Sequence, residues 1–104
     1  MGRKIFPHKR RRAYIMFIHI GHDTVIIDTE IIGIFDMENT TVMKKTVDFL
    51  NNAEKAKQIK NVAPYELPKS FIVCEEPIGK VIYISPVSVG TILKRIENSK
   101  KANF

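Results

Sequence analysis

The sequence is poor in the features that mark secreted and membrane proteins. Its 104 residues include a single cysteine and no tryptophan. A lone cysteine cannot form an internal disulfide framework, which favours a reducing, cytoplasmic location. The apolar run at residues 13–20 falls short of the roughly 18–20 residues that a membrane span needs. It also contains His19 and lacks a small-residue cleavage pattern, so we expect neither a secretory signal nor a membrane partner.

Positive charge, by contrast, is abundant but unevenly placed. The chain has 17 Lys+Arg against 11 Asp+Glu, a formal charge of +6, and the 44% hydrophobic content of a single globular domain. A basic excess suggests nucleic acid or an anionic membrane surface as partner. Six of the positive charges stand in residues 1–15 without any acid, while residues 16–104 hold 11 of each sign. The excess therefore belongs to an N-terminal arm and not to the domain.

The arm at residues 1–15 has two interpretations. Its clustered arginines, Arg10, Arg11 and Arg12 above all, could contact phosphates and gain affinity by releasing counterions. Alternatively, residues 11–16 could be the translation of a purine-rich ribosome-binding sequence and its spacer, if Arg11 and Arg12 use AGG codons. Translation would then begin at Met16, a mis-assigned start that mass spectrometry of the native N-terminus would reveal.

Apolar, β-branched stretches predict strands joined by short turns. Gly21–Thr24 supplies turn chemistry for a first hairpin, and Gly33 marks a bulge or a close backbone approach within the third stretch. Residues 61–69 contain two prolines and are typical of a loop. We expect strands at residues 14–20, 25–28, 30–36, 70–74 and 80–85.

Two further segments have apolar residues at helical spacing. The first helix has Thr40 or Thr41 available as N-cap, and the second begins with Ser85 as N-cap and Pro86 at the first helical position. The order βββ-α-ββ-α predicts an α+β fold with a small, mostly antiparallel sheet and two helices. The domain spans residues 16–97, and a tail at 98–104 is expected to fray. The apolar stripes consist of Val42, Met43, Val47, Phe49, Leu50 and Ala53 in the first helix and Val89, Ile92, Leu93 and Ile96 in the second.

No group of residues has the spacing of a catalytic or metal site. His19 on its strand points away from the face of its apolar neighbours, whereas His22 and Asp23 belong to the following turn. A surface histidine and an Asx-type turn explain them, and no second cluster completes a ligand set. Cys74 ends an apolar strand and is expected to be a buried, inert thiol. We therefore expect no enzymatic activity, no metal and no cofactor.

Basic residues within the domain are few and scattered. Lys69 precedes a strand, and Lys94 and Arg95 lie on the second helix, with Lys100 and Lys101 in its extension. Such charge runs are usually solvated faces. The helical group is nevertheless the best candidate for phosphate contacts, because its members share one helix end and its continuation.

Three segments carry a more specific pattern. They are Phe17–Ile26 leading into Ile31–Asp36, then Ser70–Val73, and finally Tyr83–Ser88 continuing into Thr91–Arg95. In order and spacing they resemble the RemA/RemB family of small bacterial regulators of extracellular-matrix and biofilm genes, nearest to its RemB branch. The resemblance covers residues 16–97. Its most specific part is the Ser85-Pro86 entry with Thr91 and Arg95.

The resemblance implies a cytoplasmic protein that assembles into closed homo-oligomeric rings. Such rings bind duplex DNA through many copies of a weak site, whose phosphate contacts add by avidity. RemA-type proteins carry arginines after the second strand and in the loop before the strand that Ser70 begins. The matching stretches here read Asp28-Thr29-Glu30 and Tyr65-Glu66-Leu67-Pro68-Lys69. Lys69 is therefore the one basic residue at these positions, whereas Arg95 matches a family arginine, as a DNA contact or as a brace of the helix.

The sequence thus predicts DNA contacts at Lys69, Lys94 and Arg95, with Arg10, Arg11 and Arg12 as arm contacts. The first hypothesis is a ring-forming regulator that acts on transcription by binding DNA, directly or alongside a regulatory protein partner. The alternative is an oligomeric protein-interaction scaffold without direct DNA contact. Affinity for duplex DNA that falls steeply with salt distinguishes the first from the second.

Overall fold

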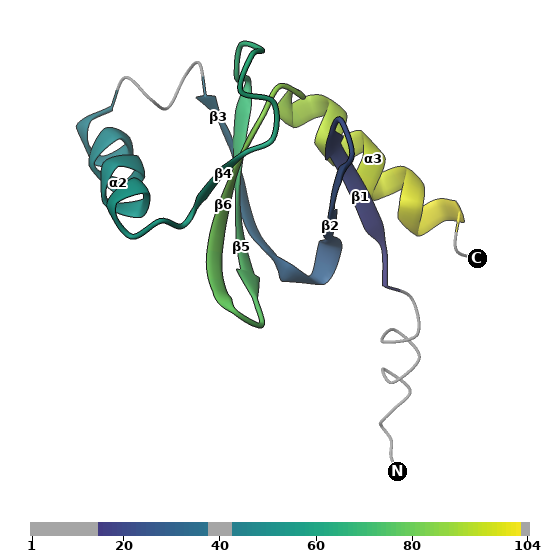
Figure 1. Cartoon of the computed structure of the whole chain (residues 1–104). Helices are drawn as coiled ribbons and strands as arrows, with labels where there is room; N and C mark the ends of the chain where they lie inside the picture. The colour runs from purple at the N-terminus through teal and green to yellow at the C-terminus, as the bar shows by residue number, and fades with distance from the viewer. Residues whose placement is uncertain (1–14, 38–42, 103–104) are drawn as a thin grey trace.

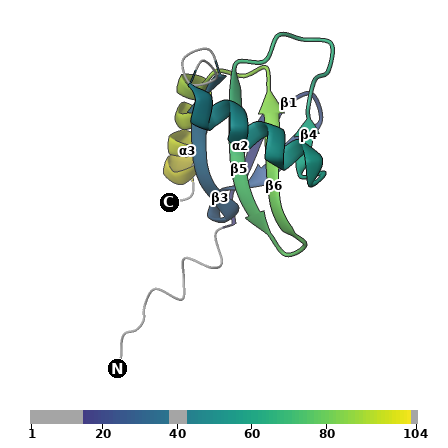
Figure 2. The ribbon, with the colours of Figure 1, turned by 90° about the vertical axis from the view of Figure 1, so that its left-hand side faces the viewer.

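A four-stranded sheet forms the centre of the protein. The computed structural model describes residues 15–37 and 43–102. Its elements are β1 (Phe17–Gly21), β2 (Thr24–Ile27), the 3-10 helix η2 (Asp28–Glu30), β3 (Ile31–Asp36), α2 (Lys44–Lys55), β4 (Ile59–Asn61), β5 (Ser70–Glu76), β6 (Gly79–Ser85) and α3 (Val89–Ala102). The strand order in the central sheet is β3-β5-β6-β4. Helix α2 covers one face, and the β1–β2 hairpin with α3 covers the other (Figures 1 and 2). The predicted α+β class is confirmed.

The central residues of β5 and β6, 71–74 and 81–84, are all apolar because both faces of these strands are buried there. Alternate residues point to opposite sides of the sheet, which divides the apolar interior into two clusters. On the side of α2 lie Phe71, Val73, Ile82 and Ile84, packed with Ala53. On the side of the hairpin and α3 lie Ile72, Cys74, Val81 and Tyr83, packed with Ile18, Ile20, Ile26 and Ile92.

The third strand contains the predicted irregularity. The register of β3 on β5 shifts between Ile31, which pairs with Cys74, and Gly33, which pairs with Val73. A Cβ atom at Gly33 would lie 2.7 Å from the ring of Phe35, so any other residue there would force that ring to shift. The predicted bulge is therefore present, whereas the group that approaches Gly33 closely is a side chain and not a backbone. The strand begins at Ile31, one residue later than predicted, because residues 28–30 form η2.

Strand β4 is absent from the sequence prediction. Residues 59–61 pair in parallel with residues 82–84 of β6, so the order is βββ-α-βββ-α. Three residues are too few for an alternating pattern to be recognised. The preceding helix ends in a Schellman motif, in which Gln58 N donates to Ala53 O and Lys57 N to Glu54 O, with Lys57 in the left-handed region at φ 59°.

The first helix begins at Lys44, and Met43 is its N-cap without a side-chain hydrogen bond. The predicted caps Thr40 and Thr41, like Val42 of the stripe, lie outside the described residues. The apolar stripe is narrower than predicted, because Met43 and Val47 are exposed. Packing against the sheet is made by Phe49, Leu50 and Ala53.

The second helix begins at Val89, not after Ser85. Ser88 is its cap, since Ser88 Oγ accepts a hydrogen bond from Thr91 N at 3.3 Å. The prediction of Ser85 as N-cap is wrong because Ser85 is the last residue of β6 and is fully buried. The helix continues to Ala102, so residues 98–102 of the predicted frayed tail are helical. No helix among the described residues is both long and apolar enough to cross a membrane.

Candidate nucleic-acid interface

Three connecting segments meet at one end of the sheet, at the top of Figure 1. They are the β1–β2 turn (residues 22–23), the loop 62–69 and residues 86–88, and we call them the loop end. Gly21, at φ 133°, allows their close packing, because a Cβ atom there would lie 3.1 Å from Val62 and 3.2 Å from Pro86. Ser85 Oγ donates to Ile20 O at 2.6 Å and accepts from Val87 N at 3.0 Å, which ties the hairpin to β6.

Lys69 lies at the loop end on a fixed backbone. Its N–H donates to Ser85 O at 2.8 Å, and its carbonyl accepts from Met37 N at 2.9 Å. The next residue, Ser70, is fully buried and donates from Oγ to Val87 O at 2.7 Å. The Lys69 side chain is exposed and forms no ion pair with the described residues. It therefore presents a cation to solvent from a rigid position.

The Arg95 side chain reaches back to the hairpin instead. Its Nη1 donates to His19 O at 2.9 Å, across the packing of α3 on β1. Ser85 and Arg95 thus both bond to carbonyls of β1, and Ser88 with Thr91 fixes the start of the same helix. The most specific part of the family pattern is therefore a set of braces that hold β1, β6 and α3 together. Lys94, the neighbouring candidate, is exposed.

The side chains of His22 and Glu66 are hydrogen-bonded at the loop end. His22 Nε2 lies 2.7 Å from Glu66 Oε2, and both side chains are about half exposed. His22 occupies the left-handed region at φ 45°, as a turn residue does. His19 is exposed on the outer face of β1, as predicted, and no group of three potential ligands gathers among the described residues. The loop that carries Lys69 thus also holds an acid and is not strongly positive.

The arm enters the described structure at the opposite end of the sheet. Met16 N donates to Asp28 Oδ1 at 3.3 Å, and Asp28 N donates to Met16 O at 3.0 Å. Helix η2 contacts β5 near Cys74, whereas Lys69 precedes the other end of that strand. Residues 28–30 and Lys69 therefore lie near opposite ends of β5. Arg10, Arg11 and Arg12 lie outside the described residues.

Cys74 has the properties of a structural thiol. It is fully buried, and burial, followed by the charges of Glu76 and Glu30, raises its pKa from 9.0 to about 12. Tyr83 lies in the same cluster and donates its hydroxyl hydrogen bond to Glu76. Burial and this hydrogen bond also raise the pKa of Tyr83. Neither group presents a reactive anion at neutral pH, in agreement with the predicted inert thiol.

Comparison with known proteins identifies the family. Residues 17–96 match the model of the RemA-like family, described as extracellular matrix regulatory protein A-like. The chain belongs to the RemA-like family. It is also 34% identical over 82 residues to extracellular matrix regulatory protein B of Bacillus subtilis (strain 168), covering 79% of this chain and 91% of that protein. This RemA-like chain thus matches its relative over nearly the whole length of the relative.

The RemA-like domain leaves large apolar side chains exposed even though both of its apolar clusters are complete. They lie on the outer face of the hairpin, on the rim between β3 and α2, and at loop tips. Scattered exposed apolar residues are ordinary, whereas a contiguous apolar patch is typical of a surface that contacts another molecule. The sequence patterns placed Met43, Val47 and Leu93 on the apolar faces of the two helices and did not single out the others. The exposed side chains are Ile15, Phe17, Val25, Ile32, Phe35, Met43, Val47, Tyr65, Leu67, Ile78 and Leu93.

Proposed function

We propose that this RemA-like chain is a cytoplasmic regulator that acts on transcription of extracellular-matrix genes, assembles into a closed homo-oligomeric ring and binds duplex DNA. The observation that carries the regulatory role is the family match over residues 17–96, which spans the whole folded domain from β1 into α3. A single 12.0 kDa domain offers few phosphate contacts. A ring multiplies them, so that weak sites add to a useful affinity.

Two exposed apolar faces support assembly. Phe17 and Val25 lie on the outer face of the hairpin, whereas Tyr65 and Leu67 protrude from the loop 62–69. These are different surfaces of the same chain, which is the arrangement that a head-to-tail contact requires. When such a contact repeats by a rotation that closes, it produces a ring and leaves no copy with an uncovered face.

The DNA contacts proposed are Lys69, Lys94 and the arm residues Arg10, Arg11 and Arg12. The proposal for Lys69 is supported by its exposed side chain and by the two hydrogen bonds that fix its backbone. The proposal for the arm is supported by the position of Met16, which is bonded to Asp28. The resemblance implies arginines in this stretch, whereas this chain has the acids Asp28 and Glu30. Arginines carried on the arm would replace the missing cations at that end of the sheet.

A scaffold without DNA contact is the second candidate function, and two observations favour it. The Arg95 guanidinium is bonded to His19 O, and Glu66 lies in the loop that also holds Lys69. The first occupies a donor of Arg95, and the second places a negative charge in the loop that carries Lys69. A partner protein would then bind the exposed apolar faces instead.

Duplex-DNA binding by the full chain, measured by fluorescence anisotropy across a salt series, separates the two functions. A DNA-binding ring predicts that log K falls linearly with log salt, by about 0.9 per phosphate contact. Lys69→Ala and the triple change of Arg10, Arg11 and Arg12 to Ala should lower the slope, while Lys55→Ala on α2 should not. Absence of binding at low salt, with an intact oligomer by light scattering, would leave the scaffold as the function.

A further inference from the structure

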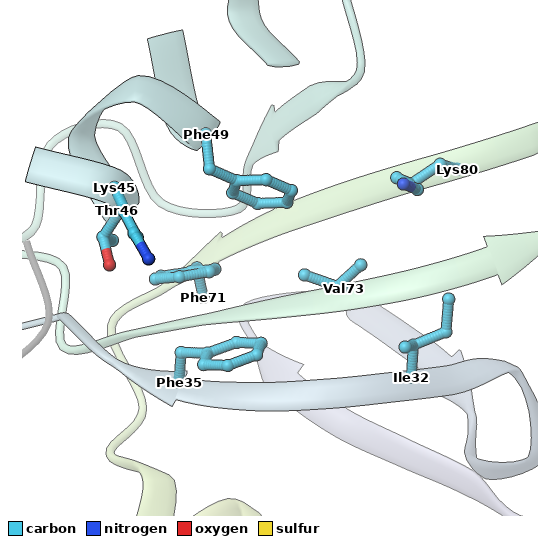
Figure 3. Close-up of a pocket in the computed structure, with 8 residues that line it drawn as sticks. All are labelled: Ile32, Phe35, Lys45, Thr46, Phe49, Phe71, Val73 and Lys80. Carbon is cyan, nitrogen blue, oxygen red and sulfur yellow. The ribbon is translucent and has the colours of Figure 1, made fainter. Parts of the chain in front are cut away.

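The face of the sheet beside α2 is only partly covered, which leaves a pocket of about 360 Å³. This volume lies within the range of small-molecule sites, roughly 300–1,000 Å³. Strands β3, β5 and β6 form the floor and α2 forms one wall (Figure 3). The pocket is lined by Ile32, Phe35, Lys45, Thr46, Phe49, Phe71, Val73 and Lys80.

The pocket has an aromatic floor. The rings of Phe35 and Phe71 stack at 4.9 Å between centroids, and Phe49 of α2 lies 6.3 Å from Phe71. Phe71 and Val73 are buried, whereas Phe35 and Ile32 remain 40% and 61% exposed. The bulge before Gly33 is the reason that Ile32 and Phe35 share this face. A flat apolar group laid along the floor would cover the exposed parts of both.

The charged residues that line the pocket are both cations. Lys45 stands with Thr46 at one end, and Lys80 stands at the other (Figure 3). Neither lysine forms an ion pair with the described residues, since the nearby Asp48 is held by Lys44 at 3.1 Å. Glu75 pairs with Lys80 across the two strands and therefore shares its face. The end at Lys45 is thus the more favourable one for an anion.

We propose that this pocket binds a small amphipathic carboxylate, with its carboxylate at Lys45 and the Thr46 hydroxyl and its aromatic or alkyl body over Phe35, Phe71 and Val73. The Lys45 ammonium and the Thr46 hydroxyl donate to the carboxylate, and the first turn of α2 adds a favourable dipole. Apolar surface lines the rest of the pocket, with few polar groups to orient the ligand, as small-molecule sites require. The proposal goes beyond the regulatory function and does not depend on DNA binding.

The positive charge of Lys45 and the negative charge of Glu75 favour a monocarboxylate over other occupants. A neutral apolar molecule would fill the floor but leave Lys45 without a counter-charge. A dicarboxylate would place its second anion beside Glu75, where like charges repel. A second copy of the chain remains a competing occupant, and the experiment below tests for it.

The test is a titration of the full chain, followed by amide NMR shifts, with two probes that share one body: phenylbutyrate and phenylbutanol. The acid should shift residues of α2, β3 and β5 around the pocket and bind about three- to tenfold more tightly than the alcohol. In Lys45→Gln this preference for the acid should disappear, which isolates the contact between Lys45 and the carboxylate. Lys55→Gln, an equal change of charge in the last turn of α2, is the matched control and should keep it.

Three results would overturn the proposal. The first is equal affinity for acid and alcohol in the unchanged chain, and the second is shifts located outside the pocket. The third is an absence of shifts at the pocket, combined with an oligomer in light scattering that Phe35→Ala dissociates. That combination would mean that a second copy of the chain fills the pocket. Lys45 is exposed, so Lys45→Gln should keep the fold, and an unaltered urea midpoint verifies this.

Discussion

Replacing Arg95 by methionine separates a structural brace from a DNA contact. Methionine keeps most of the apolar stem and removes the hydrogen bond from Nη1 to His19 O at 2.9 Å. A hydrogen bond from a charged donor is worth about 1.5–3 kcal/mol, and partial exposure of Arg95 places the expected loss near about 1.5 kcal/mol. For a domain of this size the loss corresponds to a fall in Tm of roughly 6–12 °C.

The assay combines thermal unfolding with the salt dependence of DNA binding, both at a fixed protein concentration because oligomers unfold in a concentration-dependent way. Arg95→Met should lower Tm and leave the salt slope unchanged. Lys94→Met, the adjacent exposed residue, should leave Tm unchanged and lower the slope by about 0.9 if Lys94 contacts a phosphate. An unchanged Tm together with a lower slope in Arg95→Met would refute the assignment of Arg95 as a brace.

Three other perturbations test the fold around the site. Ser85→Ala leaves Ile20 O and Val87 N without their hydrogen-bond partner and should lower the free energy of unfolding in urea by about 2–4 kcal/mol. Ser70→Ala removes one hydrogen bond and should cost less. Equal costs of the two substitutions would contradict this. Lys57→Gly removes a side chain from the left-handed region and should stabilise the chain by about 0.5–1 kcal/mol, whereas a loss would show that the Lys57 side chain makes favourable contacts. The raised pKa of Cys74 keeps its thiol protonated in the folded state while the same thiol ionises in the unfolded state. The contribution of Cys74 to stability should therefore be constant below pH 9.0 and fall as the pH rises toward about 12. Cys74→Ala should reduce that fall, and an unchanged profile would contradict the shift.

Elements with long sequence patterns could be predicted, whereas elements with short patterns could not. Strands β5 and β6 are long apolar runs that any packing must bury, and the hairpin at Gly21 has unambiguous turn chemistry. Strand β4 has only three residues and is held in place by β6, so its existence depends on tertiary pairing. Ser85 has the composition of a helix cap, but its neighbours place it in the interior, and Ser88 caps the helix instead.

The site was less predictable than the fold. Lys69 could be named from the family pattern, but its fixed backbone depends on contacts with Ser85 and Met37, which are distant in the sequence. The bond from Arg95 to His19 O joins residues 76 positions apart, and no local signal distinguishes it from a free arginine. The exposure of Phe17 likewise depends on which face of the hairpin the central sheet covers.

Sedimentation velocity of the full chain with a labelled DNA duplex, at low and at high salt, tests the central proposal most directly. A ring that binds DNA through weak repeated contacts predicts a single oligomer of fixed size that carries the duplex at low salt. The same measurement at high salt should show that oligomer intact and the duplex released. A monomer at both salt concentrations, or an oligomer that never carries the duplex, would contradict the proposal that this RemA-like chain is a DNA-binding ring.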